Sequence, residues 1–222
     1  MSPVKPVQIA IVDDVLLYRK SIQLYLSQAP HIQVALTTDS GFALLTYLQN
    51  HHLDVVLLDL HMPSISGFDV CTQLRQQYPE VKILIVSQLT DDLSVHKVML
   101  TGAHGFFSKN TDPEGLTDAI DRLLSHGYFF SMDLQSVIAL AHDLPSFEVA
   151  LHPMPELSPT EKTVLRYTAQ GLANKEIADR LGLSARTIEK HKENILKKYQ
   201  QNNIIGAFVV ALKQQHIQLG EV

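Results

Sequence analysis

The sequence predicts an α/β domain with a doubly wound, five-stranded parallel sheet, followed by a small all-α domain of four helices that contains a helix-turn-helix. In the first part of the 222-residue chain, five short apolar runs are each followed by a longer amphipathic stretch. Such alternation of strands and helices builds parallel sheets. From Leu157 onward the pattern is wholly helical, and a proline-rich stretch precedes it.

The five strand-and-helix units are placed by their hydrophobic period. Strands are expected at 7–12, 32–36, 55–58, 83–86 and 105–107. Each strand leads into a helix, at about 15–27, 41–50, 67–77, 91–100 and 113–125. Sheets of this kind bind ligands at the carboxyl ends of their strands, so a site is sought at that edge.

We expect the first domain to cover residues 1–127, a connector and linker residues 128–156, and the helical domain residues 157–222. A partly helical connector at 128–142 should lead into a linker at 143–156, where residues that break regular structure gather. These residues are Asp143, Pro145, Ser146, Pro153 and Pro155.

The helical domain opens on a capping signal. Ser158, Pro159 and Glu161 offer an N-cap, a proline at the first helical position and a reciprocal glutamate, for a helix that should end near residue 171. A short helix, a turn at Gly182 and a second helix then form a helix-turn-helix. The three further helices are expected at about 174–181, 184–199 and 204–214.

The net charge of −5 hides an asymmetry. Residues 1–156 carry 8 Lys and Arg against 17 Asp and Glu, a net charge of −9, whereas residues 157–222 carry 10 against 6, a net charge of +4. A basic domain on an acidic body indicates a polyanion as partner of the basic part alone. Charge by itself leaves ordinary surface scatter as an equal alternative.

Composition points to a cytoplasmic protein without a zinc site. Cys71 is the only cysteine, so no internal disulfide is possible, as suits a reducing compartment. The N-terminus lacks the apolar stretch of a signal peptide, and no apolar run approaches the about 20 residues that span a bilayer. The 11 histidines show no metal-binding spacing.

Charged and polar residues stand at the ends of four predicted strands. Asp13 and Asp14 follow the first, Asp59 the third, Ser87 ends the fourth, and Lys109 follows the fifth. Because the carboxyl ends of parallel strands share one edge, three carboxylates should meet there and require a cation. Oxygen ligands in an open, hydrated site favour Mg²⁺. A metal and a lysine would neutralise an incoming phosphoryl group, and Asp59 could act as the nucleophile.

Residues 7–125 resemble the receiver domain of two-component response regulators, which has a flavodoxin-like fold. The matching pieces are Asp13-Asp14, the block Asp59-x-x-Met62-Pro63-x-x-x-Gly67, Ser87, and Gly102-Ala103-x-Gly105-Phe106-x-x-Lys109. The resemblance implies phosphorylation of Asp59. It also implies a Mg²⁺ ion bound by Asp14, Asp59 and the backbone carbonyl of His61, with Asp13 acting through water.

The same resemblance assigns a phosphoryl-binding role to Ser87 and Lys109 and an aromatic switch to Phe106. Two positions depart from the family. Gln88 stands where many receivers have a small residue, which would crowd the phosphoryl pocket, and Val15 stands where relatives often have a polar residue.

Residues 157–216 resemble the LuxR-type helix-turn-helix of the NarL/FixJ class. The matching pieces are Leu157-Ser158-x-x-Glu161, Val164-Leu165, Gly171-Leu172-x-Asn174-Lys175-Glu176-Ile177-Ala178, Leu181-Gly182-Leu183-Ser184, and Thr187-Ile188-Glu189-Lys190-His191. The resemblance implies a transcriptional regulator, not an enzyme, that accepts a phosphoryl group from a sensor histidine kinase. It further implies binding to double-stranded promoter DNA, and a homodimer when phosphorylated or DNA-bound.

The helix at 184–199 is the expected recognition helix. At about 100° per residue, Ile188, Ile195 and Tyr199 share a core face, and the opposite face is polar. The residues expected to contact DNA are Lys175, Ser184, Arg186, Thr187, Lys190, His191, Lys192, Asn194 and Lys197. A plain solvated face, with Glu193 and Lys197 paired at i, i+4, is the alternative. Glu189 and the lack of an arginine near Asn202 depart from many relatives.

Two other functions remain open. A Mg²⁺-dependent phosphohydrolase also uses an aspartate nucleophile after a strand, but such enzymes resemble one another in a second aspartate two residues later, where this chain has His61. The other alternative is a binding module, either with a receiver that switches without phosphate or with helices that bind protein rather than DNA.

Overall fold

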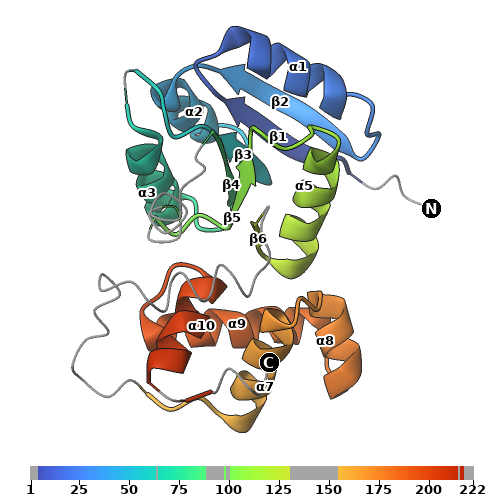
Figure 1. Cartoon of the computed structure of the whole chain (residues 1–222), viewed down its shortest axis with the longest axis vertical. Helices are drawn as coiled ribbons and strands as arrows, with labels where there is room; N and C mark the ends of the chain where they lie inside the picture. Colours follow the sequence, from blue (N-terminus) through green and yellow to red (C-terminus); the bar gives the residue numbers. More distant parts are fainter. Residues whose placement is uncertain are drawn as a thin grey trace.

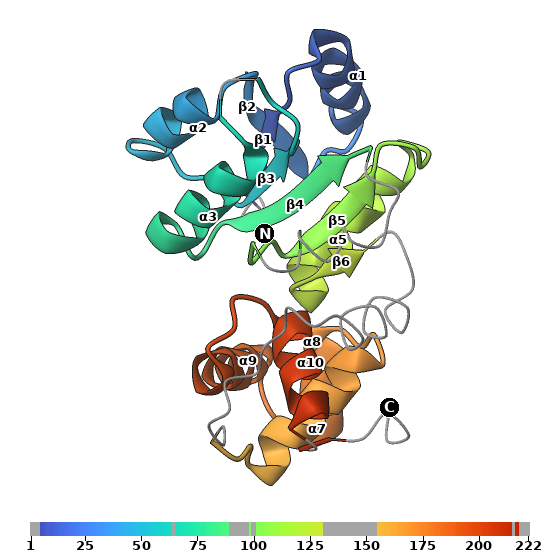
Figure 2. The same ribbon diagram turned by 60° about the vertical axis from the view of Figure 1, so that its left-hand side comes forward.

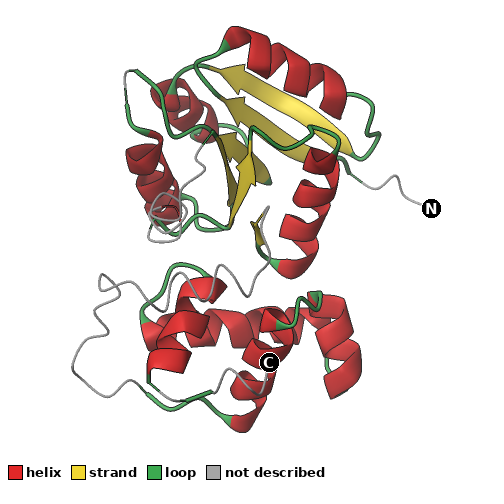
Figure 3. Ribbon diagram, viewed as in Figure 1, coloured by secondary structure: helices red, strands yellow, loops and turns green. Residues whose placement is uncertain are grey.

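The computed structural model describes residues 5–63, 65–88, 98, 101–130, 155–214 and 216–217. Its first domain is built on one parallel sheet, in the order β2-β1-β3-β4-β5-β6 (Figures 1 and 3). The strands are β1 (Val7–Val12), β2 (Ile32–Thr38), β3 (Val55–Leu58), β4 (Lys82–Ser87), β5 (Gly105–Ser108) and β6 (Phe129–Phe130).

Helices cover both faces of this sheet, as a doubly wound fold requires. The described helices of this domain are α1 (Leu16–Leu26), α2 (Gly41–Leu48), α3 (Gly67–Gln77) and α5 (Gly115–His126). Side chains of α1 and α5 share one apolar core with the sheet, and side chains of α2 and α3 share a second core on the other face. The helix expected at 91–100 lies outside the described residues, apart from the helical, buried Val98.

The expectation of five strands was wrong, because β6 adds a sixth. Gly127, in a left-handed conformation with φ of 87°, ends α5 and turns the chain back beside β5. A Cβ at Gly105 would lie 2.2 Å from the Phe129 carbonyl oxygen, so the glycine permits this close strand approach. The connector expected at 128–142 therefore begins as a strand and not as a helix. Its remainder, 131–142, lies outside the described residues.

In its described residues the second domain contains four helices, as the sequence predicted. They are α7 (Pro159–Ala169), α8 (Asn174–Leu181), α9 (Ala185–Tyr199) and α10 (Ile204–Lys213). The capping box of α7 is present: the Glu161 amide donates to Ser158 Oγ at 3.3 Å, and the Ser158 amide donates to Glu161 Oε2 at 2.7 Å. Ser184 Oγ caps α9 by accepting from the Thr187 amide at 3.1 Å.

The apolar face of α9 holds this domain together. Ile188, Ile195 and Tyr199 are each 0% exposed, as the helical period predicted. Tyr128, from the end of the first domain, belongs to the same core and donates its hydroxyl to the Thr168 carbonyl at 2.7 Å. The two domains therefore contact each other through this side chain. Figure 2 shows the four helices lying beneath β6 and the end of α5. Among the described residues, every helix is too short or too polar to cross a membrane.

Candidate functional site

The register of the parallel strands brings the predicted site residues to one edge. Val12 pairs with Leu58, and Leu58 pairs with Ile85, so β1, β3 and β4 end at similar heights. The Asp59 amide donates to the Val12 carbonyl at 2.8 Å, and the Lys109 amide donates to the Ser87 carbonyl at 2.9 Å. These bonds extend the strand pairing by one residue and hold the site loops next to one another.

Three carboxylates meet at this edge. Asp13, Asp14 and Asp59 each offer an oxygen within 4.8 Å of the others. Asp13 is 2% exposed and Asp59 is 4% exposed, whereas Asp14 is exposed to solvent. Like charges this close repel unless a cation is present, and hard oxygen ligands suit a small divalent ion. A shallow hollow of about 440 Å³, lined by Asp14, His61 and neighbouring residues, opens beside the cluster.

Lys109 supplies a cation in this structure. Its Nζ lies 2.6 Å from Asp13 Oδ2 and 2.6 Å from Asp59 Oδ2, and its side chain is 8% exposed. Burial alone would lower the pKa of Lys109, but the hydrogen bonds and charges of the two aspartates raise it above its usual value. The lysine is therefore charged at neutral pH and faces the carboxylate proposed to react.

The loop after β3 is fixed by a glycine and a helix cap. A Cβ at Gly67 would lie 2.2 Å from the Asp59 carbonyl oxygen, and the Gly67 amide donates to the Leu60 carbonyl at 3.1 Å. Any larger residue at Gly67 would push the Asp59 backbone away. The His61 amide donates to Asp59 Oδ1 at 3.2 Å, which orients that carboxylate.

Ser87 and Phe106 are both buried. Ser87 is 0% exposed, and His61 Nδ1 lies 3.3 Å from its Oγ. Phe106 is 3% exposed and packs in the core shared with α2 and α3. In this structure the ring of Phe106 therefore occupies a buried position. Gln88, which was expected to crowd the pocket, is exposed.

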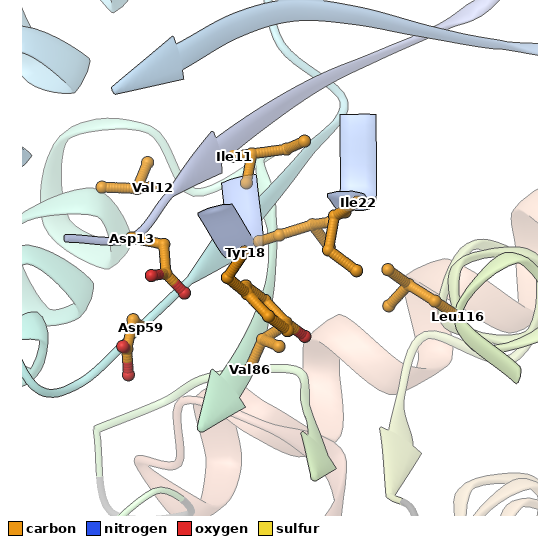
Figure 4. Close-up of a pocket in the computed structure, with 9 residues that line it drawn as sticks. Ile11, Val12, Asp13, Tyr18, Ile22, Asp59, Val86 and Leu116 are labelled. Atoms are coloured by element: carbon orange, nitrogen blue, oxygen red, sulfur yellow. The ribbon is translucent and has the colours of Figure 1, made fainter. Parts of the chain in front are cut away.

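Two residues at the site were missed by the sequence analysis. The ring of Tyr18 lies beside Asp13 and Asp59 (Figure 4), and Lys109 Nζ is 4.7 Å from its centroid. Arg19 donates from Nη1 to the Asp13 carbonyl, and its Nη2 lies 3.8 Å from Asp39 Oδ2. The available signal was their place in the first two turns of a helix that follows the acidic pair directly.

Most of the residues expected to contact DNA lie on the surface of the second domain. Arg186 and Lys190 on α9, and Lys175 and Ser184 near the starts of α8 and α9, are exposed. Lys197 is exposed as well, and it lines an interdomain cleft of about 880 Å³. Three further members of the set are half-buried: Thr187, His191 and Asn194.

Lys192 differs from the rest of that set. It is 8% exposed, and its Nζ donates to Asn174 Oδ1 at 2.6 Å and to the His126 carbonyl at 3.0 Å. Burial, together with the charge of Lys82, lowers the pKa of Lys192 to about 7, against an opposing effect of Glu189. In this arrangement the Lys192 amino group caps the end of α5 and does not face solvent.

Two more contacts join the domains on the other side of the cleft. Arg75 Nη2 donates to the Asn202 carbonyl at 3.1 Å, and Asn203 Nδ2 donates to the Ala103 carbonyl at 3.4 Å. Gly102 has φ of 80°, and a Cβ there would lie 2.6 Å from Asn202 Cβ, so the glycine allows this approach. The loop between α9 and α10 therefore rests on the first domain.

Two family descriptions match the chain. Residues 9–121 match the response regulator receiver domain, and residues 155–211 match the bacterial regulatory proteins of the luxR family. The luxR-type family comprises DNA-binding transcription regulators and not enzymes.

Individual relatives span nearly the whole chain. The fimbriae Z protein of Salmonella typhimurium is 34% identical over 201 residues, covering 90% of this chain and 94% of the relative. The nitrate/nitrite response regulator protein NarP of Escherichia coli is 30% identical over 218 residues, covering 98% and 100%.

Solved structures share the fold. The RcsB response regulator of Salmonella typhimurium has a TM-score of 0.55 at 23% identity and covers 92% of this chain and 97% of its own. An RcsB–DNA complex has a TM-score of 0.56 at 24% identity, covering 93% and 98%. The chain is therefore a two-component response regulator of the NarL/FixJ class, a transcriptional regulator with a receiver domain and a LuxR-type DNA-binding domain.

Proposed function

We propose that Asp59 accepts a phosphoryl group from the phosphohistidine of a sensor kinase and that this controls DNA binding by α9. The observation that carries the proposal is Lys109 Nζ at 2.6 Å from the Asp59 carboxylate, at an edge where three carboxylates meet. An Asp59 oxygen forms a bond to phosphorus while the bond from phosphorus to the donor nitrogen breaks, and the electron pair leaves with the donor.

Asp13, Asp14, Asp59 and the backbone carbonyl of His61 would hold Mg²⁺ in this proposal. The all-oxygen set and the open side at Asp14 support it. The ion would supply positive charge that offsets the charge of the phosphoryl oxygens. Lys109 would pair with one phosphoryl oxygen and Ser87 would donate its hydroxyl to another.

A rearrangement around Ser87 and Phe106 would carry the signal. Phosphorylation adds about two negative charges, which Ser87 and Lys109 would close upon. Since His61 Nδ1 is 3.3 Å from Ser87 Oγ, this contact must break when the serine turns to the phosphoryl group. The ring of Phe106 would then move into the space that Ser87 leaves.

The kinase would dock beside the site on the exposed apolar side of α1. On this helix Leu16 is 55% exposed, Leu17 is 76% exposed and Leu24 is 69% exposed. Large apolar side chains exposed next to one another are typical of protein interfaces. This surface directly follows Asp13 and Asp14, so a partner seated there can reach Asp59.

DNA would be bound by α9 in the major groove, with the start of α8 on the backbone. The proposed contacts are Lys175, Ser184, Arg186, Thr187, Lys190, His191, Lys192, Asn194 and Lys197. The exposure of Arg186, Lys190 and Lys197 supports this, as does the net charge of +4 of residues 157–222. The two half-sites of a promoter would be read by a homodimer formed on phosphorylation or on DNA.

The contacts between the domains support an inhibited state without phosphate. Lys192 is held at His126, and α10 is tied to the first domain through Asn203. We propose a receiver at 1–127, a connector and linker at 128–156 and a DNA-binding domain at 157–222. The connector begins with β6, which pairs with the receiver sheet, and its residues 131–154 lie outside the described residues. The site of action would be the cytoplasm, where promoter DNA and the kinase's phosphohistidine are found.

The test of this function is phosphorylation by acetyl phosphate with Mg²⁺. Asp59→Asn should abolish acyl phosphate formation, measured by mass spectrometry, and should abolish the gain in promoter binding. Asp118→Asn, at a side chain that is 69% exposed, is the matched control and should behave as the wild type. Undiminished acyl phosphate on the Asp59→Asn protein would refute the assignment.

A further inference from the structure

We propose that Tyr18 is a positioning residue for phosphoryl transfer, whose ring face holds the ammonium of Lys109 over Asp59. The inference rests on the proposed phosphorylation of Asp59. It assigns a role to a side chain that neither the acidic cluster nor the phosphoryl-binding set includes.

The contact has the geometry of a cation–π interaction. Lys109 Nζ lies 4.7 Å from the ring centroid of Tyr18, inside the distance of about 6 Å at which a ring face attracts an ammonium. Asp13 and Asp59 hold the same Nζ at 2.6 Å each. The ring therefore forms a third side of the ammonium's surroundings, and it comes from α1, an element that contributes no carboxylate to the site.

The ring is itself held in place. Together with Ile22, Val86 and Leu116 it lines a pocket behind Asp13 and Asp59 (Figure 4). The free space there is about 10 Å³, about the room that one water needs. On its core side, between α1 and α5, the ring therefore has little free space into which it could move away from Lys109, although the residue is partly exposed.

The hydroxyl of Tyr18 has no part in the proposed role. Burial, followed by the charges of Asp13 and Asp59, raises the pKa of Tyr18 far above its usual value. The hydroxyl thus keeps its proton and is not an acid, base or nucleophile at neutral pH. What the side chain offers Lys109 is the electron-rich ring face, which phenylalanine also provides.

The reaction explains why a third contact matters. Asp13 and Asp59 hold Lys109 in this structure, yet their oxygens are also needed by the divalent cation and, at Asp59, by the new bond to phosphorus. With acetyl phosphate, an Asp59 oxygen bonds to phosphorus, the bond from phosphorus to the acetyl oxygen breaks, and acetate leaves with the electron pair. The ring face takes part in none of these bonds, so it can hold Lys109 near the phosphoryl oxygens throughout.

The first experiment compares full-length Tyr18→Phe and Tyr18→Leu proteins. With acetyl phosphate and Mg²⁺, Tyr18→Leu should form the acyl phosphate about two- to fivefold more slowly, the range expected for a partly exposed cation–π contact. Tyr18→Phe should stay close to the wild type, because the ring face remains. Equal rates for the two variants would overturn the proposal.

The second experiment needs neither metal nor phosphate. A double-mutant cycle combines Tyr18→Leu with Lys109→Met and follows urea unfolding. The two substitutions should be non-additive by about two- to fivefold in the unfolding equilibrium constant. Additive effects would mean that the ring only packs, and would overturn the proposal. Coupling without a change in phosphorylation rate would also overturn it, because the contact would then position nothing for the reaction.

If Tyr18→Leu does not fold, Tyr18→Met, which fills irregular space more readily, takes its place in both experiments. If the wild-type protein forms no acyl phosphate on Asp59, the proposed function fails. The unfolding cycle then decides on its own whether Tyr18 holds Lys109.

Discussion

Two buried lysines of this chain, Lys109 and Lys192, and the half-buried Lys198 have different partners. Lys109 lies between two carboxylates, Lys198 Nζ lies 2.6 Å from the single carboxylate of Glu161, and Lys192 donates to two uncharged oxygens. The pKa of Lys109 is accordingly raised, whereas that of Lys192 is lowered to about 7. An ammonium without a carboxylate is the costliest of the three to bury, so Lys192 belongs to an arrangement that can open.

The ion pair of Lys198 and Glu161 is expected to stabilise the second domain. Glu161 is 4% exposed, caps α7 and accepts from Lys198. Glu161→Gln keeps the shape but removes the charge, and should lower the free energy of unfolding by about 1–2 kcal/mol at pH 7, as judged by urea denaturation. Glu156→Gln, at an exposed side chain just before α7, is the control and should have little effect.

The effect of Glu161→Gln should also depend on pH. Burial alone would raise the pKa of Glu161, but the hydrogen bonds from Lys198 and Ser158 hold it below its usual value of 4.5. The charged carboxylate therefore stabilises the fold above pH 4.5, and this stabilisation is lost as the pH falls through the lowered pKa. A difference between wild type and variant that stays constant down to pH 3 would contradict this account.

Among the helices, α9 is expected to contact DNA, and substitutions on it should weaken promoter binding. Lys190→Ala should weaken specific promoter binding by about 1–3 kcal/mol if the side chain reads a base. Lys197→Ala should weaken binding evenly across sequences and lower the salt dependence by about one counterion. Binding titrations at several salt concentrations measure both. Lys162→Ala on α7 is the matched control, and if all three variants bind as the wild type, α9 is not the recognition helix.

How well each element could be predicted depended on how local its causes are. The bounds of α8, α9 and α10 follow from caps and an apolar period within the segment itself, and they agree with the sequence to within a residue or so. Strand β6 has only two residues, too few to show a period, and it exists because Gly105 and Gly127 let the chain return beside β5.

The site was predictable for a different reason. Asp13, Asp59, Ser87 and Lys109 each stand at the end of a strand, and parallel topology alone brings such positions together. The position of Tyr18 over Lys109 depends on how α1 packs against the sheet. The burial of Lys192 depends on how one domain packs against another, and polar residues on two separate surfaces carry no pattern that reveals such a contact.

At the scale of the whole molecule, the receiver holds part of the DNA-reading domain. Lys192 is bonded to α5, and the loop before α10 to the region around Ala103 and Arg75. The acidic body, with its net charge of −9 over residues 1–156, would also repel a duplex brought near α9. Separation of the domains should therefore help DNA binding.

Truncation tests directly whether the receiver inhibits DNA binding. A fragment of residues 151–222 should bind promoter DNA without phosphate, and at least as tightly as the unphosphorylated full-length protein, because neither the contacts to His126 nor the acidic body remain. Circular dichroism establishes that the fragment is folded. A folded fragment that binds more weakly would mean that the receiver does not inhibit, and that phosphorylation acts chiefly by driving dimerisation.

The burial of Lys192 should make the contact between the two domains depend on pH. In the closed arrangement, in which Lys192 is bonded to His126 of the receiver, the pKa of Lys192 is about 7, against 10.5 for an exposed lysine. Closure therefore favours the uncharged amine. The free-energy cost of closing the domains grows as the pH falls from 10.5 to 7, and it is constant below pH 7. The pKa of the neighbouring His126 is lowered, by burial first, from 6.5, so that ring does not titrate between pH 7 and 9.

Raising the pH from 7 to 9 should thus favour closure and weaken DNA binding by the full-length protein relative to the 151–222 fragment. The ratio of the two dissociation constants should rise, by up to about fiftyfold if the full-length protein is fully closed. Taking the ratio cancels any direct effect of pH on the contacts between DNA and α9, which both proteins share. With Lys192→Met in both, the change of the ratio with pH should be much smaller, because methionine is uncharged throughout. Any part that remains belongs to Lys82, which lines the same cleft and whose pKa burial lowers. A wild-type ratio that is flat from pH 7 to 9 would show that Lys192 remains solvated, and that the domains do not close on it in solution.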